Sequence, residues 1–318
     1  MLSLSEIENA AAIVYAAMPP TAQYAWPLLA RRTGCEVWVK HENHTPIGAF
    51  KVRGGLVYMD RLKQREPRLK GVASATRGNH GQSIALAAAR NGIAATIVVP
   101  EGNSVEKNAA MRAFGAELIE AGHDFDAARE AAIRLAGERG LTMVPSFHRD
   151  LVAGVSSYAL ELFRAAPPLD TVYVPIGLGS GLCGVIAARD AFALKTKVVG
   201  VVSTEAPAYA LSFAAGKVVA TNSANTMADG MAVRGPDAEA LDVILKGADR
   251  IVQVSDAEVM EAMRAYYSDT HQVTEGAGAG ALAALMQERD RMKGKKVGVI
   301  LSGGNIDKPV YLRALAGG

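Results

Sequence analysis

The sequence predicts an α/β protein with two lobes, each built on a mostly parallel sheet covered by helices. Three observations support this prediction. Strand-like and helix-like segments alternate in two series, separated by a break near residue 150. The strand-like segments are mostly continuous apolar runs, as expected for strands buried on both faces of a parallel sheet. The length of 318 residues also exceeds the usual size of one compact core.

The individual elements follow in chain order. The N-terminus is predicted to form an amphipathic helix, with Ser3 as its N-cap and Glu6 completing a capping box. The first series predicts strands at 71–76, 94–100 and 116–121 and helices at 81–92, 105–115 and 124–139. The second predicts strands at 171–176, 197–203, 250–255 and 296–304 and helices at 181–194, 256–267 and 276–289. The stretch 214–250 lacks clear periodicity and is expected to be irregular.

Composition excludes several classes of protein. Thirty-four Lys and Arg residues against 32 Asp and Glu residues give a net charge of +2, without a basic block that would suit nucleic acid or a membrane surface. No apolar run is long enough to span a membrane, and Glu6 and Glu8 argue against a signal peptide. Two cysteines, Cys35 and Cys183, do not make a disulfide framework, which favours the cytoplasm.

Ligands bind beyond the carboxyl ends of strands in parallel sheets, so the turns that follow strands are the informative ones. The turn PIGLGSGL at 175–182 has the glycines and the following helix of a phosphate cradle, although an ordinary tight turn is equally compatible with it. Residues 179–184 also fit GxGxxG, with Glu205 about twenty residues further on. A nicotinamide-dependent oxidoreductase is therefore an alternative on spacing alone.

Two other turns carry polar residues. Residues 74–81, SATRGNHG, offer hydroxyls, an amide and backbone N–H groups at a helix start, which suit a carboxylate. Arg77 can add a charge-assisted hydrogen bond, while simple helix capping by Thr76 or Asn79 is the structural alternative. The turn at 301–305, LSGGN, carries little information by itself.

Lys51 lies in TPIGAFKVRGG at 45–55, directly after Phe50. A lysine amine in an apolar pocket has a lowered pKa and forms a Schiff base with an aldehyde. A reactive lysine, a phosphate cradle and a carboxylate turn together match pyridoxal phosphate and an amino-acid substrate. A solvated surface lysine is the commoner fate of any single lysine.

These motifs resemble those of the fold-type II pyridoxal-phosphate enzymes, in the threonine/serine dehydratase and serine racemase family, which has a tryptophan synthase β-like fold. TPIGAFKVRGG is similar to the lysine motif Pro-x-Gly-Ser-Phe-Lys-x-Arg-Gly, and residues 74–82 to Ser-x-Gly-Asn-His-x-Gln. GLGSGL resembles the phosphate loop, although many members have four consecutive glycines, and SGGN resembles the C-terminal serine turn. The four motifs occur in the order and spacing of the family.

The resemblance implies a role for each matched residue. Lys51 would bind the cofactor aldehyde and, once released, take the α-proton of the substrate, while Ser302 would face the pyridine nitrogen. Phe50 would pack beside the cofactor ring and Asn79 would bind its phenolic oxygen. The phosphate would lie on Gly177, Leu178, Gly179, Ser180, Gly181 and Leu182. The substrate carboxylate would lie among Ser74, Thr76, Arg77, Gly78, Asn79 and His80.

The implied reaction is α,β-elimination of water from L-threonine or L-serine, giving a 2-oxo acid and ammonia. Arg77 stands where serine racemases carry a serine acid/base, which weighs against racemisation, although an amino-acid racemase stays an alternative. An arginine there could recognise a second polar group, so 3-hydroxyaspartate, phenylserine and related substrates stay open. A non-catalytic ligand-binding protein is disfavoured because Lys51 is intact.

The resemblance also implies the organisation of the chain. We expect a large lobe from residues 1–50 and 151–318, a smaller inserted lobe from 51–150, and a homodimer. Only Glu205 is acidic where some members bind a divalent cation, so no metal is expected. Glu275 resembles a glutamate near the cofactor, or is simply a helix N-terminal charge. Because the chain ends just past the serine turn, we expect a catabolic enzyme without a regulatory domain.

Overall fold

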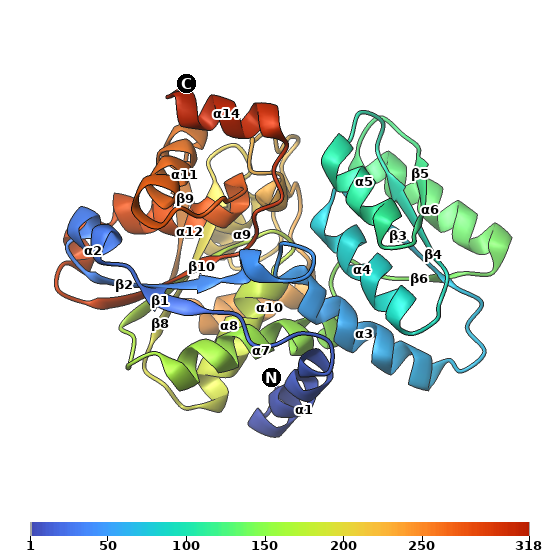
Figure 1. Ribbon diagram of the computed structural model, residues 1–318, viewed down its shortest axis with the longest axis horizontal. Coiled ribbons are helices and arrows are strands. Elements are labelled where there is room, and N and C mark those ends of the chain that lie inside the picture. The colour runs from blue at the N-terminus through green and yellow to red at the C-terminus, as the bar shows by residue number, and fades with distance from the viewer. Residues whose placement is uncertain (1, 318) are drawn as a thin grey trace.

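The computed structural model describes residues 2–317 and has two helix-covered sheets (Figure 1). The larger sheet has six strands in the order β1-β2-β10-β7-β8-β9. They are β1 Gln23–Ala25, β2 Glu36–His41, β10 Lys296–Leu301, β7 Thr171–Pro175, β8 Lys197–Ser203 and β9 Arg250–Val254. Only β1 is antiparallel to its neighbour, and the other pairs are parallel.

The smaller sheet has four parallel strands in the order β5-β4-β3-β6. They are β3 Val72–Ala75, β4 Ala95–Val99, β5 Glu117–Glu120 and β6 Thr142–Met143. We call this sheet with its helices the small lobe, and the six-stranded sheet with its helices the large lobe. The α/β class with mostly parallel sheets is confirmed, while the lobe boundaries at 50/51 and 150/151 stay predictions.

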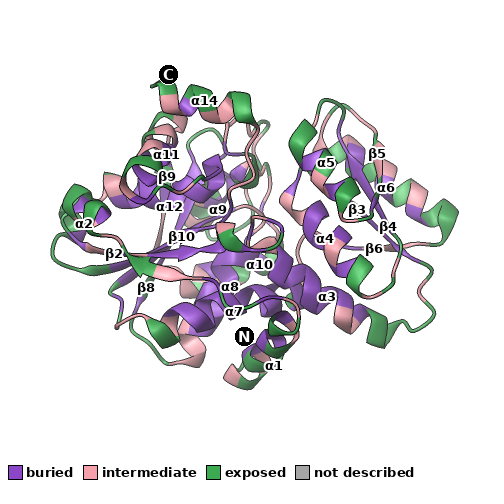
Figure 2. Ribbon diagram, in the orientation of Figure 1, coloured by how far each residue is buried: buried purple, intermediate pink, exposed green. Residues whose placement is uncertain are grey.

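Burial explains why the strands were visible in the sequence. Every residue of β3, β4 and β7 is buried, and in β8 only Lys197 is exposed. Such strands are covered by helices on both faces and therefore read as apolar runs. Figure 2 shows buried residues concentrated on the strands and on the helix faces that pack against them.

Helices cover both sheets. Those of the small lobe are α4 Asn79–Arg90, α5 Val105–Ala113 and α6 Phe125–Arg139. Those around the large sheet are α1 Leu4–Tyr15, α2 Pro27–Thr33, α7 Arg149–Ala165, α8 Ser180–Ala191, α9 Ala208–Ala215, α10 Ala238–Gly247, α11 Asp256–Thr270, α12 Gly276–Gln287, α13 Arg289–Met292 and α14 Lys308–Ala316. Two 3-10 turns, η1 Glu42–His44 and η2 Asp229–Met231, complete the fold. The predicted capping box at α1 is confirmed, because Ser3 and Glu6 cap each other's backbone.

Helix α3, Lys51–Arg65, lies between the lobes, in a segment for which no helix was predicted. Two successive glycines let it approach a helix on either side. A methyl group at Gly54 would lie 2.9 Å from the Leu151 carbonyl oxygen of α7, and one at Gly55 would lie 2.2 Å from the Ser83 hydroxyl of α4. The Gly-Gly pair therefore serves close helix packing and does not break the helix.

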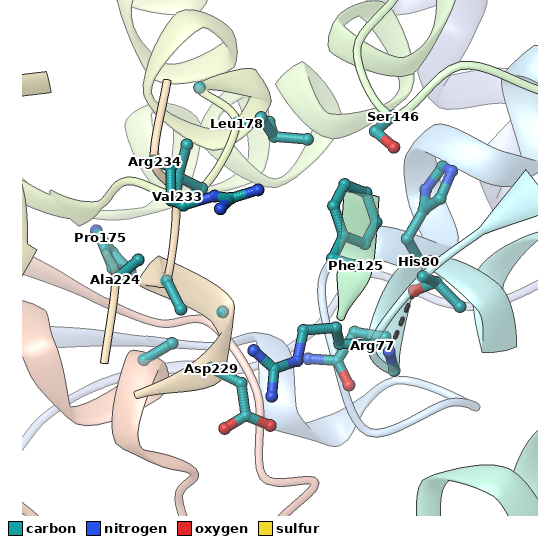
Figure 3. A pocket seen from close by; sticks show the side chains of 18 of the residues that line it. Arg77, His80, Phe125, Ser146, Pro175, Leu178, Ala224, Asp229, Val233 and Arg234 are labelled. Atoms are coloured by element: carbon teal, nitrogen blue, oxygen red, sulfur yellow. Dashed lines mark hydrogen bonds between the residues drawn. The ribbon is translucent and has the colours of Figure 1, made fainter. Parts of the chain in front are cut away.

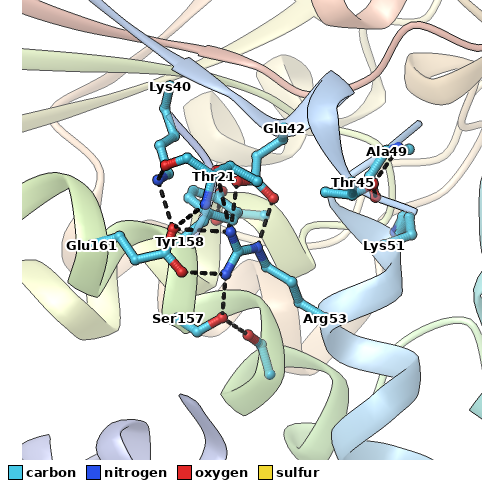
Figure 4. A network of polar contacts seen from close by, with 12 residues as sticks. Thr21, Lys40, Glu42, Thr45, Ala49, Lys51, Arg53, Ser157, Tyr158 and Glu161 are labelled. Atoms are coloured by element: carbon cyan, nitrogen blue, oxygen red, sulfur yellow. Dashed lines mark hydrogen bonds and ion pairs between the residues drawn. The ribbon is translucent and has the colours of Figure 1, made fainter. Parts of the chain in front are cut away.

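A buried network of charges anchors the first turn of α3 to the large lobe (Figure 4). The Arg53 guanidinium donates to Glu42 from Nε at 2.7 Å and to Glu161 from Nη1 at 2.6 Å. Lys40 Nζ donates to the other oxygen of Glu161 at 2.6 Å. All four side chains are almost completely buried, so two cations balance two anions away from water, as buried charges require.

Residues 216–237 are irregular apart from η2, so the expectation for 214–250 is correct only in part. The stretch 214–250 contains α10, whose N-cap Asp237 accepts hydrogen bonds from the N–H groups of Glu239 and Ala240. The break near residue 150 is occupied by α7, in which every residue from Asp150 to Leu162 is buried. The buried residues of this helix include the polar Ser156, Ser157 and Glu161, so burial here does not follow polarity. Within residues 2–317, no helix combines the length and apolarity needed to cross a bilayer.

Candidate active site

A pocket of about 750 Å³ lies between the two lobes (Figure 3). Its walls come from the segments that follow parallel strands of both sheets, among them Thr76 after β3, Ser146 after β6, Gly177 after β7 and Ser302 after β10. The two sheets thus direct their carboxyl ends toward one space, which is the expected position of a ligand in such folds.

The turn between β7 and α8 presents an anion site to this pocket. None of the backbone N–H groups of residues 177–182 has an acceptor in the part of the chain that the structure describes. Gly179, the N-cap of α8, has a φ of 97°, and a methyl group there would lie 2.7 Å from Ala240 Cβ. The Tyr209 hydroxyl holds the loop by donating to the Leu178 carbonyl at 3.0 Å. Unpaired N–H groups at a helix N-terminus bind phosphate well.

A second anion site lies at the start of α4. This helix begins at Asn79, two residues earlier than predicted, so Asn79 and His80 belong to its first turn. The Thr76 hydroxyl accepts hydrogen bonds from the N–H groups of Gly78 and Gly81, which supports the capping interpretation of Thr76. The N–H groups of Asn79 and His80 find no acceptor among the described residues. They are therefore available to a carboxylate.

Lys51 lines the same pocket at the start of α3. Its Nζ lies 3.3 Å from the Ser180 hydroxyl and 5.0 Å from the centroid of the Phe50 ring. Burial lowers the pKa of the Lys51 amine to about 8, although the Glu275 carboxylate opposes this shift. About a tenth of the amine is therefore neutral, and hence nucleophilic, at pH 7, and about half at pH 8.

Ser302 and Lys51 are brought together by the backbone. The Phe50 N–H donates to the Ser302 carbonyl at 3.0 Å, and Ala49 forms a β-bridge with Gly303. Ser302 is buried and lines the pocket.

Burial and the neighbouring Lys51 charge lower the pKa of His80 to about 3, so its imidazole is neutral. The Nε2 atom of His80 is buried and has no hydrogen-bond partner among residues 2–317.

The structure gathers most of the residues that the motifs pointed to. The pocket is lined by Phe50, Lys51, Thr76, Arg77, Gly78, Asn79, His80, Gly177, Leu178, Gly179, Ser180, Gly181 and Ser302. Ser74 and Leu182 do not line it. Ser74 is buried and donates to the Val144 carbonyl, and the Leu182 side chain is part of the core. Glu205 also lies outside this pocket. The role of each residue toward a ligand stays a prediction.

Sequence analysis missed a group of charged residues at the pocket. Lys107 Nζ of the small lobe lies 2.7 Å from Asp229 of the large lobe, and Arg234 is ion-paired with Asp126 across the same gap. Lys107 follows β4 and Asp126 follows β5, so the rule about strand ends would have found both. The segment 220–225 also contributes to the wall.

The arrangement suits one kind of chemistry. Helices α3, α4 and α8 direct their N-termini into one pocket, and these helix ends carry partial positive charge. The site can therefore hold two anionic groups, one on α8 and one on α4, with a partly neutral amine available to both. Formation of a Schiff base with an aldehyde that carries a phosphate requires such a set of groups.

Comparison with known proteins places this geometry in context. Residues 16–303 match the family described as "Pyridoxal-phosphate dependent enzyme". The chain is 35% identical over 308 residues to L-threonine ammonia-lyase from Thermotoga maritima, covering 96% of this chain and 76% of that protein. It is 33% identical to L-threo-3-hydroxyaspartate ammonia-lyase from Saccharomyces cerevisiae, covering 91% and 89%. The structure of maize serine racemase superimposes with a TM-score of 0.92 at 26% identity, covering 99% and 97%.

Proposed function

Since the chain belongs to the family of pyridoxal-phosphate dependent enzymes, we propose that it is an ammonia-lyase acting on a β-hydroxy amino acid such as L-threonine or L-serine. The products are a 2-oxo acid and ammonia. The observation that carries the proposal is the convergence of the Lys51 amine with the free N–H groups of residues 177–182 and of Asn79 and His80 in one pocket. The alternative of a nicotinamide-dependent oxidoreductase assigns no role to that lysine.

The residues present fit pyridoxal phosphate. The six unpaired N–H groups at the start of α8 suit its phosphate, and the Lys51 amine, with a pKa of about 8, suits its aldehyde. The Ser302 hydroxyl, buried at the end of β10, suits its pyridine nitrogen, as the family resemblance implies. When bound, the cofactor withdraws electrons from the α-carbon of the substrate and so makes its proton acidic.

The protein supplies the positioning and the proton transfer. In the proposal, the N–H groups of Asn79 and His80 and the neighbouring Thr76 turn hold the substrate carboxylate at the positive end of α4. The Lys51 Nζ takes the α-proton as a general base. The C–O bond at the β-carbon then breaks, and the hydroxyl takes up one proton and leaves as water, so that the proton taken by Lys51 and the proton given to the hydroxyl balance. The resulting enamine hydrolyses to the 2-oxo acid and ammonia.

A racemase needs a second proton carrier on the other face of the substrate. Arg77 lies in the turn before α4, where such a carrier would stand in serine racemases, and a guanidinium does not give up its proton in proteins. This is why we favour elimination over racemisation, although racemases are among the structural neighbours. Accumulation of a 2-oxo acid, as opposed to the other enantiomer, distinguishes the two reactions.

A second candidate substrate is a β-hydroxy amino acid with a second carboxylate, such as 3-hydroxyaspartate. Among the cations of the pocket, Lys107 and Arg234 are ion-paired with acidic residues. Arg77 has no ion pair or hydrogen bond in the part of the chain that the structure describes, and its exposed side chain extends into the pocket (Figure 3). A substrate carboxylate is a suitable partner for it.

The direct test is a panel of β-hydroxy amino acids, each as both stereoisomers, supplied to the enzyme loaded with pyridoxal phosphate. Release of ammonia and 2-oxo acid in equal amounts from at least one of them is expected, and Lys51→Ala is expected to abolish it. The proposed function is wrong if the loaded enzyme releases neither product from any of them.

We also infer a cytoplasmic homodimer, in keeping with the two buried, free cysteines. Light scattering tests the dimer.

A further inference from the structure

The side-chain amide of Asn79 makes two hydrogen bonds that define its orientation. Its Nδ2 donates to Glu275 Oε1 at 2.7 Å, and its Oδ1 accepts from Asn305 Nδ2 at 2.8 Å. Asn79 lies on α4 of the small lobe, whereas Glu275 precedes α12 and Asn305 follows β10 in the large lobe. The amide is therefore fixed between two residues of the opposite lobe.

Both neighbours of Asn79 require the same orientation. Asn305 Nδ2 also donates to the Ile47 carbonyl at 2.7 Å, and a carbonyl can only accept, so Asn305 must present its NH2 group to Asn79. At the other end, an ionised Glu275 carboxylate can only accept. A flipped Asn79 would place oxygen against oxygen at Glu275 and NH2 against NH2 at Asn305. A backbone carbonyl and a carboxylate thus select one orientation independently.

This orientation leaves one N–H of Asn79 for a ligand. An amide NH2 group has two hydrogens, and Glu275 takes one of them. The Nδ2 atom has no other acceptor among the described residues, and Asn79 lines the pocket. The side chain is therefore prepared as a hydrogen-bond donor toward whatever occupies the pocket next to Lys51.

Glu275 is the N-cap residue of α12, yet its side chain does not cap that helix. It points to Asn79 and is only 5% exposed. Lys107, from α5 of the small lobe, places its Nζ 3.6 Å from Glu275 Oε2 and 2.7 Å from Asp229. The pKa of Glu275 is raised, mainly by burial and further by the charge of Asp229, while Lys107 and the Asn79 hydrogen bond oppose part of that rise. The other titratable groups that line the surrounding pocket are Lys51 on α3, Arg77 and His80 at α4, Asp124 and Asp126 at α6, Asp229 in η2 and Arg234.

We propose that Glu275 is a positioning residue, which together with Asn305 holds the Asn79 amide as a hydrogen-bond donor to the bound cofactor, while Lys107 from the other lobe faces the second oxygen of the Glu275 carboxyl group. This deepens the proposed function and rests on it only in that the cofactor must bind in this pocket. The bonding partner in the cofactor is an oxygen that carries negative charge, since such an acceptor forms the stronger bond.

A double-mutant cycle tests the proposal without substrate. The dissociation constant of pyridoxal phosphate is measured for the apoprotein and for Glu275→Ala, Asn79→Ala and the double variant. We expect Glu275→Ala to weaken binding about tenfold in the natural background, as loss of a charge-assisted hydrogen bond would. In the Asn79→Ala background the same change should cost less than about twofold, because the amide that it orients is gone.

A spectroscopic readout separates positioning from general loosening of the fold. We expect Glu275→Ala to move the pH midpoint of the visible absorbance of the loaded enzyme in the same direction as Asn79→Ala. Glu106→Ala is the matched control, because it removes another contact between the lobes, the hydrogen bond from the Lys308 N–H, at a residue that does not line the pocket, and it should leave the midpoint unchanged. An equal shift in the control would overturn the proposal, as would equal losses of affinity in both Asn79 backgrounds.

If Glu275→Ala does not fold, the same double-mutant cycle can be measured with Asn305→Ala, because Asn305 binds the oxygen of the Asn79 amide. Its effect on cofactor affinity should likewise vanish in the Asn79→Ala background, and additivity there would also refute the proposal. The failure of the proposed function looks different. In that case the cycle behaves as expected, yet no β-hydroxy amino acid releases ammonia.

Discussion

The amine of Lys51 lies 3.3 Å from the hydroxyl of Ser180, so the first residue of α3 meets the first residue of α8. Hydrogen bonds to backbone carbonyl groups hold both helix starts. The Phe50 N–H donates to the Ser302 carbonyl at 3.0 Å, and the Tyr158 hydroxyl donates to the Gly181 carbonyl at 3.0 Å. The lysine and the anion site are therefore carried by rigid elements, as a site that must keep its geometry requires.

The burial of Lys51 predicts how cofactor capture depends on pH. Only the neutral amine attacks an aldehyde, and the pKa of Lys51 is lowered to about 8 from the ordinary lysine value of 10.5. The rate at which the apoprotein captures pyridoxal phosphate should rise with pH up to about 8 and level off above it. Stopped-flow visible absorbance measures this rate, and Lys51→Ala should give no signal. A rate that climbs steadily to pH 10 would show that the amine is not buried.

The conformation of Gly179 predicts a specific loss of cofactor binding. Alanine is strained at a φ of 97°, and its methyl group would lie 2.7 Å from Ala240 Cβ. Gly179→Ala should therefore distort the loop and weaken cofactor binding at least about tenfold. Gly216→Ala is the matched control, because Gly216 has a φ of 66° and open space around it. Both variants should lose about 1 kcal/mol of stability, but equal losses of cofactor affinity would contradict the role of the loop.

The buried network around Arg53 predicts a large effect on stability. Removing one partner leaves buried charges unpaired, so Arg53→Ala should lower the free energy of unfolding by about 3–5 kcal/mol. Asp242→Ala is the control, since it breaks a helix-surface pair with Lys246 whose side chains are 65% and 71% exposed. That change should cost less than about 0.5 kcal/mol. Urea unfolding of both variants compares the two, and similar losses would mean that the buried network adds no net stability.

Sequence analysis located the strands and several helices because their burial produces a pattern within a few residues. The helices that it missed have local features that hide them. Helix α7 lies at the break between the two predicted series and buries polar residues such as Glu161, and α3 contains Gly54 and Gly55, which are typical of loops. These glycines are explained only by the helices that pack against them, α7 and α4, and those contacts are tertiary.

The site, like the fold, was predictable from the sequence only where its residues are contiguous in the chain. The turns around Gly179 and Asn79 were identified because helix N-termini and short polar motifs are properties of contiguous residues. The contact of Lys107 with Glu275 and the hydrogen bond from Asn79 to Glu275 join residues that are far apart in the chain. Only the docking of one lobe against the other brings them together, and no spacing in the sequence encodes that.

Arg77 has no ion pair among the described residues, and this predicts which substrates the enzyme distinguishes. If its guanidinium binds a second carboxylate, Arg77→Ala should lower kcat/KM for 3-hydroxyaspartate by roughly tenfold to a hundredfold, mainly through KM, because a charge-assisted hydrogen bond contributes about 1.5–3 kcal/mol. Threonine, which has no second carboxylate, should be affected less than about threefold.

The charge-retaining variant Arg77→Lys separates the contribution of charge from that of the bidentate geometry of arginine. It should recover part of the lost affinity for the acidic substrate, since a lysine keeps the charge but cannot form two parallel hydrogen bonds. Steady-state release of ammonia from both substrates measures these effects. If Arg77→Ala lowers kcat/KM equally for threonine and 3-hydroxyaspartate, Arg77 binds the α-carboxylate that both share. The second carboxylate would then need another partner, because Lys107 and Arg234 are already paired.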